Sequence, residues 1–192
     1  MFARRDALVN LASILRSAPG SDDEVVEEGL LEPGDEALAA DDVRLEGPLS
    51  WSLVVRRTGG DDDDFIVDGT VAGTAVLACR RCLEDVPVDV DADFVYLMRH
   101  RPSDHPEIAL VEDEDADEDL LEFGQPTVDF APLLRQVFAI DVPLTALCRE
   151  DCKGLSLDGV NLNEHPEAAT PADDGARAPS PFAALEDLEL QD

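Results

Sequence analysis

The most regular pattern of hydrophobic and polar positions lies in residues 86–96. Hydrophobic residues alternate there with proline and aspartate, so that an extended segment has one apolar and one polar face. A period of two residues predicts a β-strand with one face in the core and the other in water. The predicted core positions are Val86, Val88, Val90, Ala92, Phe94 and Tyr96.

Two stretches that precede this strand also have the composition of β-structure. Residues 43–57 are rich in Val and Leu and are interrupted at Gly47. Residues 65–79 are rich in Val, Thr and Gly, and they predict a strand with a bend near Gly69 or Gly73. Together with the alternating segment, these stretches predict a fold dominated by antiparallel strands.

Helical periodicity appears at two places. In residues 130–138, hydrophobic side chains recur at i, i+3, i+4, i+7 and i+8, which predicts an amphipathic helix with Asp129 or Thr127 as its N-cap. Residues 8–17 place apolar side chains at helical spacing, with Asn10 available as an N-cap. The sequence therefore predicts one or two helices packed on the sheet.

Three acidic segments lack a clear periodicity. Residues 21–42 hold many acids and no basic residue, and they predict a solvated loop with one short strand at Val25-Val26. Residues 112–122 contain 8 acids in 11 positions, which would repel one another in a helix, so we expect a flexible loop. Residues 166–192 are largely Ala, Pro, Asp and Glu and predict a disordered tail with a single helix at 182–190.

These elements predict an α+β fold, mainly an antiparallel β-sheet with one or two packed helices and acidic loops. The folded domain is expected to span residues 1–165, followed by an acidic, Ala/Pro-rich tail over 166–192. Hydrophobic residues make up 44% of the chain, which is enough for a globular core.

The acidic excess narrows the classes of partner. The 192 residues include 45 acidic and 14 basic side chains, for a formal net charge of −31. This charge argues against unaided binding to DNA, to RNA phosphates or to an anionic membrane surface. No apolar run approaches the roughly 20 residues of a membrane span, so we expect a cytoplasmic protein.

The four cysteines of the chain form two pairs, Cys79 with Cys82 and Cys148 with Cys152. Paired cysteines separated by two to four residues supply the thiolates of tetrahedral zinc sites, so the sequence predicts a structural zinc site with four cysteine ligands. Two alternatives stay open. The thiols are either reduced in a site without metal, or Cys79 and Cys82 form a redox pair whose pKa is lowered by the flanking arginines.

Basic residues flank both cysteine pairs. Arg80, Arg81, Arg149 and Lys153 are placed to offset the charge of bound thiolates. If a metal brings the two pairs together, these four and Arg135 are expected to form a basic spot able to contact ribosomal RNA or another partner. The alternative is that they only neutralise thiolates and nearby carboxylates, and a steep loss of RNA binding with salt would separate the two.

Several of these motifs together resemble the bacterial YceD-like family of large ribosomal RNA accumulation proteins. The resemblance covers about residues 8–165. Its motifs are Ile14-Leu15-Arg16 with Pro19-Gly20, Gly69-Thr70-Val71, Cys79-Arg80-Arg81-Cys82-Leu83-Glu84, the segment from Val128 to Arg135, the segment from Cys148 to Leu155, and Gly159-Val160-Asn161-Leu162-Asn163.

The chain departs from the family pattern after Leu155. The family continues with Cys-Pro-x-Cys-Gly, whereas this chain continues Ser156-Leu157-Asp158-Gly159, so two cysteines are absent and the loop is one residue shorter. Either the four remaining cysteines suffice for zinc or the metal site has decayed.

The resemblance implies a non-enzymatic factor that supports large-subunit ribosomal RNA accumulation and ribosome assembly. A ribosomal protein or a pre-ribosomal particle is the implied partner. The acidic runs are either solvated surface or a polyphosphate-like surface that engages a basic ribosomal protein or shields it from RNA. The alternative is a zinc- or thiol-based regulatory protein that uses the two cysteine pairs. No catalytic motif supports an enzyme, because His100, His105 and His165 are scattered through polar stretches.

Overall fold

A computed structural model describes residues 6–18, 21–32, 44–58, 64–103, 108–112 and 119–169. The predicted tail helix at 182–190 lies outside the described residues, as does most of the predicted tail. The boundary at residue 165 therefore stays a prediction. Within the described ranges, no helix has the length and apolar character needed to cross a membrane.

The main sheet has the strand order β2-β4-β5-β6-β8-β7, with β3 pairing additionally with β5. All pairs are antiparallel except β6 with β8, which is parallel. The strands are β2 (Glu24–Leu31), β3 (Arg44–Leu45), β4 (Leu49–Arg57), β5 (Asp64–Ala78), β6 (Asp85–His100), β7 (Ala109–Glu112) and β8 (Asp119–Phe123).

A second, two-stranded sheet pairs β1 (Leu8–Asn10) with β9 (Thr127–Asp129). The helices are α1 (Ala12–Leu15) and α2 (Ala131–Asp141), and a 3-10 turn η1 spans Pro166–Ala168. The α+β fold, mainly antiparallel with packed helices, is confirmed.

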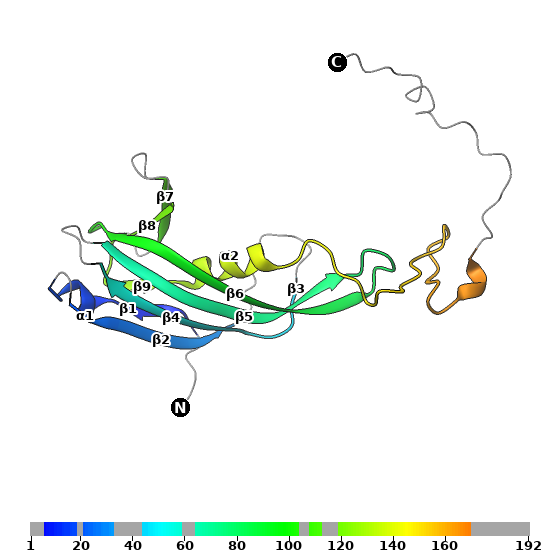
Figure 1. Ribbon diagram of the computed structural model, residues 1–192, viewed down its shortest axis with the longest axis horizontal. Helices are drawn as coiled ribbons and strands as arrows, with labels where there is room; N and C mark the ends of the chain where they lie inside the picture. Colours follow the sequence, from blue (N-terminus) through cyan, green and yellow to red (C-terminus); the bar gives the residue numbers. More distant parts are fainter. Residues whose placement is uncertain are drawn as a thin grey trace, which may run out of the picture.

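The core lies between one face of the sheet and α2. The helix contacts β5 and β6, and Figure 1 shows it lying along the long, curved hairpin that these strands form. The largest fully buried side chains include phenylalanines from both layers, and the rings of Phe65 and Phe123 meet edge to face with centroids 5.7 Å apart. Phe130 and Phe138 close the core from the helical side.

The predicted alternation in β6 is confirmed. Val90, Ala92 and Phe94 are buried, while Asp91 and Asp93 face solvent. The two-residue period of the strand therefore directs the aspartate side chains to solvent and the apolar side chains to the core.

The predicted interruption at Gly47 is also confirmed. β3 and β4 both pair with β5, and Gly47 (φ +96°) turns the chain between them. A left-handed backbone conformation of this kind favours glycine because it has no Cβ. The turn at Gly47 thus allows β3 and β4 to pair one after the other with the long strand β5.

The glycines of β5 serve close packing, and the strand runs without interruption through both. A Cβ at Gly69 would lie 2.7 Å from the backbone oxygen of Ser52 and 2.7 Å from the ring of Phe94. A Cβ at Gly73 would lie 2.5 Å from the Cδ2 of Leu49. Both positions face the inner side of the sheet, where only glycine leaves room for these neighbours.

The helix predicted for residues 8–17 is wrong in its first half. Leu8–Asn10 is a strand, and the helix is limited to Ala12–Leu15. Val9 is fully buried, and the backbone N–H of Leu11 donates to the carbonyl of Pro126 (2.7 Å). Pairing with a segment more than a hundred residues away thus overrides the local spacing. The N-cap is Leu11 rather than the predicted Asn10, although the Oδ1 of Asn10 accepts the backbone N–H of Ala12 (2.9 Å).

Two acidic segments predicted as loops contain longer strands than expected. Residues 24–31 pair with β4 over their full length, and Glu24 and Glu28 face solvent while Leu31 is buried. At the end of the segment 112–122, residues 119–123 form β8, which is held by the buried Leu120 and Phe123. A few buried apolar residues therefore suffice to hold both strands in the sheet. Residues 113–118 lie outside the described residues.

The predicted amphipathic helix is confirmed as α2. Its N-cap is Phe130 rather than the predicted Asp129 or Thr127, and the Oδ1 of Asp129 accepts the backbone N–H of Ala131 (2.9 Å). The helix ends at Asp141, two residues before Pro143, as proline requires. Its buried residues are Ala131, Leu133, Leu134, Val137 and Phe138.

We expect Leu134→Asp to unfold the domain. Leu134 is fully buried, so the substitution would place an unpaired carboxylate in the core, at a cost of more than about 4 kcal/mol. Circular dichroism melts should show no cooperative transition for this variant. Gln136→Asp, on the exposed side of the same helix, should change the stability by less than about 0.5 kcal/mol. A melt of Leu134→Asp like that of the unaltered chain would contradict the packing described above.

Candidate metal centre

The first cysteine loop is the turn that joins β5 to β6. The backbone N–H of Cys79 donates to the carbonyl of Glu84 (2.7 Å), and that of Leu83 donates to the carbonyl of Cys79 (2.9 Å). Leu83 adopts a left-handed conformation (φ +62°), which closes the turn. Cys79 and Cys82 are thereby fixed at the end of the longest strand pair of the fold.

The second cysteine loop follows α2 and is attached directly to the first. Cys79 forms a parallel β-bridge with Ala146, whose carbonyl accepts the backbone N–H of Arg80 (3.0 Å). Two residues later the chain reaches Cys148, and the backbone N–H of Cys152 donates to the carbonyl of Arg149 (3.2 Å) to close the second turn. Figure 1 shows these loops extending beyond the ends of β5 and β6.

The two loops bring all four cysteine sulfurs together. Every pair of Sγ atoms lies within 4.8 Å. The distances between the loops are 3.9 Å for Cys79 to Cys152 and 3.6 Å for Cys82 to Cys148. Four sulfurs at about 2.3 Å from a tetrahedral zinc ion would lie about 3.8 Å apart. The thiols are all free, so the group fits a metal centre with four cysteine ligands.

The cluster is closed on one side and open on the other. Cys79, Cys82 and Cys152 are buried, whereas Cys148 is exposed. Val86, Leu147 and Leu155 pack against the buried sulfurs. An ion held here would be shielded from most of the solvent, as in structural metal sites.

The surroundings of the thiols favour ionisation at two positions. Backbone N–H groups of Cys148 and Cys82 lower the pKa of Cys79 to about 6. The side-chain amide of Asn163, 3.3 Å from the sulfur, lowers the pKa of Cys152. The backbone N–H of Glu84 favours the Cys82 thiolate, but burial and the neighbouring thiols outweigh it and raise the pKa of Cys82. Metal binding would therefore release protons from the cluster.

A third loop, residues 154–163, lies against both cysteine loops. The backbone N–H of Leu155 donates to the carbonyl of Arg81 (3.1 Å), and Leu155 bridges to Asn161 in a small hairpin. Residues 156–159 form the turn of this hairpin. The spacing of the residues in 159–163 does not indicate that Asn163 contacts a cysteine sulfur, because that contact depends on the hairpin.

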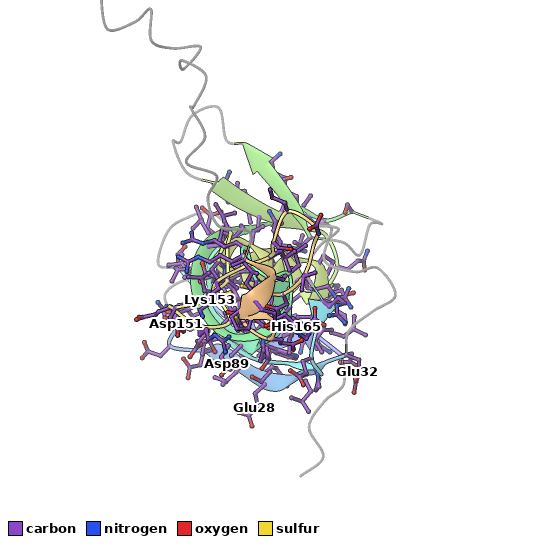
Figure 2. The ribbon with its side chains drawn as sticks, turned by 90° about the vertical axis from the view of Figure 1, so that its right-hand side faces the viewer. Glu28, Glu32, Asp89, Asp151, Lys153 and His165 are labelled. Carbon is purple, nitrogen blue, oxygen red and sulfur yellow. The ribbon has the colours of Figure 1, made fainter. Side chains whose placement is uncertain are left out.

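The side chain of Arg81 connects the two cysteine loops by hydrogen bonds. Its guanidinium donates to the carbonyls of Glu150 (3.0 Å) and Cys152 (2.9 Å), which ties the first loop to the second. Arg149 lies 3.7 Å from the carboxylate of Asp151 in the same loop. Figure 2, which faces this end of the molecule, labels Asp151 and Lys153 on the second loop and His165 beyond it.

The structure brings four of the five predicted basic residues together. Arg80, Arg81, Arg149 and Lys153 belong to the two cysteine loops or follow them directly, but those loops also carry the carboxylates of Glu84, Glu150 and Asp151. Asp85, the first residue of β6, pairs with Arg44. Arg135 belongs to α2, which lies over the middle of the sheet rather than at its end (Figure 1). The loops thus have only a small excess of positive side-chain charge before the thiolates ionise.

The two histidines that the structure describes, His100 and His165, lie outside the sulfur cluster. The ring of His165 contacts the carboxylate of Glu167 (3.2 Å), and that of His100 packs against Phe123 with centroids 5.1 Å apart. His105 is outside the described residues.

A protein-family model matches most of this chain. The family model described as "Large ribosomal RNA subunit accumulation protein YceD" matches residues 67–189, which include both cysteine loops. No solved structure matches the chain.

Two plant proteins, each described as chloroplastic large ribosomal RNA subunit accumulation protein YCED homolog 1, are also similar. The one from Zea mays is 29% identical over 138 residues, which cover 60% of this chain and 46% of the relative. The one from Arabidopsis thaliana is 27% identical over 119 residues, which cover 51% of this chain and 37% of the relative. The chain thus spans less than half the length of these relatives. Because the family model matches well over half of its residues, the chain belongs to the YceD family of large ribosomal RNA subunit accumulation proteins.

Proposed function

We propose that this chain is a non-enzymatic factor that supports the accumulation of large-subunit ribosomal RNA during ribosome assembly in the cytoplasm. The observation that carries this proposal is the family match over residues 67–189, which contains the sulfur cluster and the helix α2. Three of the four cysteines are buried, and hydrogen bonds connect the loops that carry them. This arrangement suits a structural metal centre better than a site for substrate turnover.

Zinc is the metal we propose for the cluster, with Cys79, Cys82, Cys148 and Cys152 as its ligands. Bound zinc would cross-link the end of the β5–β6 hairpin to the segment after α2. Four thiolates select zinc among common cellular ions because they are soft ligands in a tetrahedral arrangement. The charge of this centre would be offset by Arg81 and the other basic residues of the loops.

We propose a basic protein of the assembling large subunit as the direct partner. Exposed carboxylates line the face of the sheet opposite α2, where β2 carries Glu24 and Glu28 and β6 carries Asp89, Asp91 and Asp93. The net charge of −31 favours a basic protein over RNA phosphates. Contact with ribosomal RNA through Arg80, Arg81, Arg149 and Lys153 is the weaker proposal, because three carboxylates of the same loops accompany them.

A second candidate function is that of a zinc- or thiol-based regulator. It is favoured by the exposure of Cys148, whose sulfur lies 3.6 Å from that of Cys82. An exposed thiol is the position at which an oxidant or a competing ligand would first reach the cluster.

One Zn²⁺ or Co²⁺ ion should bind per chain. With Co²⁺, titration should produce a thiolate-to-metal charge-transfer band, and Cys79→Ser should abolish tight binding because it removes a buried ligand. Zn²⁺ at a hundredfold excess over its Kd should stabilise the fold by about 2.7 kcal/mol. His165→Ala is the matched control, since His165 is close in sequence to Cys152 but outside the cluster. Failure of the unaltered chain to bind metal would contradict this proposal.

Depletion of this protein should lower the ratio of large- to small-subunit ribosomal RNA in cells. A plasmid copy of the unaltered chain should restore the ratio, which is measured by RNA electrophoresis. Cys148→Ser separates the two candidate functions when its thermal melt shows that it is folded. If the protein is an assembly factor, the folded variant should restore the ratio of the two ribosomal RNAs. If it is a regulator, that ratio should respond to oxidant or zinc with the unaltered chain and should no longer respond with the variant. An unchanged ratio after depletion would contradict the assembly role.

A further inference from the structure

A continuous series of hydrogen bonds connects the two cysteine loops through asparagine side chains. The Nδ2 of Asn163 donates to the Sγ of Cys152 (3.3 Å) and to the Oδ1 of Asn161 (2.9 Å). The Nδ2 of Asn161 donates to one carboxylate oxygen of Glu84 (2.8 Å). The other oxygen of Glu84 lies 3.5 Å from the Sγ of Cys82. The series therefore begins at a sulfur of the second loop and reaches Glu84 in the first, where the Cys82 thiol donates the last bond while it is protonated.

Backbone donors fix the orientation of both amides. The Oδ1 of Asn163 accepts the backbone N–H of Lys153 (2.8 Å), so the NH₂ group of this amide must face Cys152. The Oδ1 of Asn161 accepts the backbone N–H of Asn163 (3.0 Å), so its NH₂ group must face Glu84. Turning either amide over would set two N–H donors against each other. The sulfur of Cys152 thus faces a donor whose direction is determined.

The backbone of the third loop holds these amides in place. The N–H of Leu162 donates to the carbonyl of Gly154 (2.9 Å), which closes the hairpin. Gly154 has a φ of +78°, and a Cβ there would lie 3.0 Å from the carbonyl oxygen of Arg81. The close contact at Gly154 brings the hairpin against the first cysteine loop, so that one short segment touches both loops.

We propose that Asn163 is a positioning residue for the metal centre, orienting the Cys152 ligand and joining it through Asn161 to the first cysteine loop. The inference rests on the metal centre proposed above. A donor to a coordinating sulfur holds the ligand in place before the ion arrives, which lowers the ordering cost of binding. Loss of a partner that orients a metal ligand typically costs about 10- to 100-fold in metal affinity.

Substitution of Asn163 tests this role in the full chain with Co²⁺ as the probe. Asn163→Asp keeps an acceptor for the Lys153 N–H but sets a carboxylate oxygen against the sulfur of Cys152. Asn163→Leu removes the donor without adding a charge. Competition with a chromophoric chelator should show Co²⁺ affinity at least about 10-fold weaker in both variants. The thiolate-to-Co²⁺ charge-transfer band should also shift, because the hydrogen bond to sulfur changes the energy of its electrons.

Ser156→Ala is the matched control. It removes a hydrogen bond of the same loop, from the backbone N–H of Val160 to the Ser156 Oγ (3.1 Å), and that bond involves no sulfur. This variant should keep the affinity and the band of the unaltered chain, even if it melts at a lower temperature.

Three results would overturn the inference. Unaltered affinity and band position in both Asn163 variants would show that the amide does not orient the ligand. An equal loss in Ser156→Ala would show a purely structural effect of the loop. Absence of Co²⁺ binding by the unaltered chain would overturn the metal centre itself, and the role of Asn163 with it.

Discussion

The register of β5 with β6 is the constraint on which the rest of this structure depends. The two strands pair continuously from Asp64 with Arg99 to Ala78 with Asp85. That register places the inner side chains of both strands against α2, and it ends one residue before Cys79. A slip of one residue would turn the apolar face of the hairpin to solvent and would move the first cysteine loop away from Ala146. Core and candidate metal centre are therefore products of the same pairing.

The same hairpin explains how so acidic a chain folds. No charged residue is buried in the part of the chain that the structure describes. Glu24 and Glu28 of β2 and the aspartates of β6 occupy exposed positions, while the inner positions of β6 carry Val, Ala and Phe and Glu27 of β2 is half-buried. Folding thus keeps most of this charge away from the core, and it leaves an acidic face available for a basic partner.

The parts of the fold that could be predicted are those encoded within a few neighbouring residues. The alternation in β6 and the spacing in α2 are local, and both predictions were confirmed. The strand at Leu8–Asn10 could not be predicted in this way, because its partner is Thr127–Asp129. The full lengths of β2 and β8 were not predicted, because the many acidic residues of these segments favour a loop and only a few apolar residues hold each strand.

In the candidate metal centre, too, some features could be predicted from the sequence and others could not. The four cysteines were predicted as ligands from their spacing, and the structure places their sulfurs within 4.8 Å of one another. The basic spot was predicted from neighbours in sequence, and Arg135 lies elsewhere because α2 is over the middle of the sheet. The contact of Asn163 with Cys152 depends on the hairpin of the third loop, a feature that spacing does not encode. Residues that support a ligand are set by the folded chain, whereas ligands are visible in sequence.

We propose that two loops, set side by side by the fold, hold one zinc ion through four sulfurs. X-ray absorption spectroscopy at the zinc edge of the zinc-loaded full chain measures this coordination. We expect a first coordination sphere of four sulfur atoms at about 2.3 Å. A sphere that contains oxygen or nitrogen in place of one or more sulfurs, or a chain that retains no zinc, would contradict it.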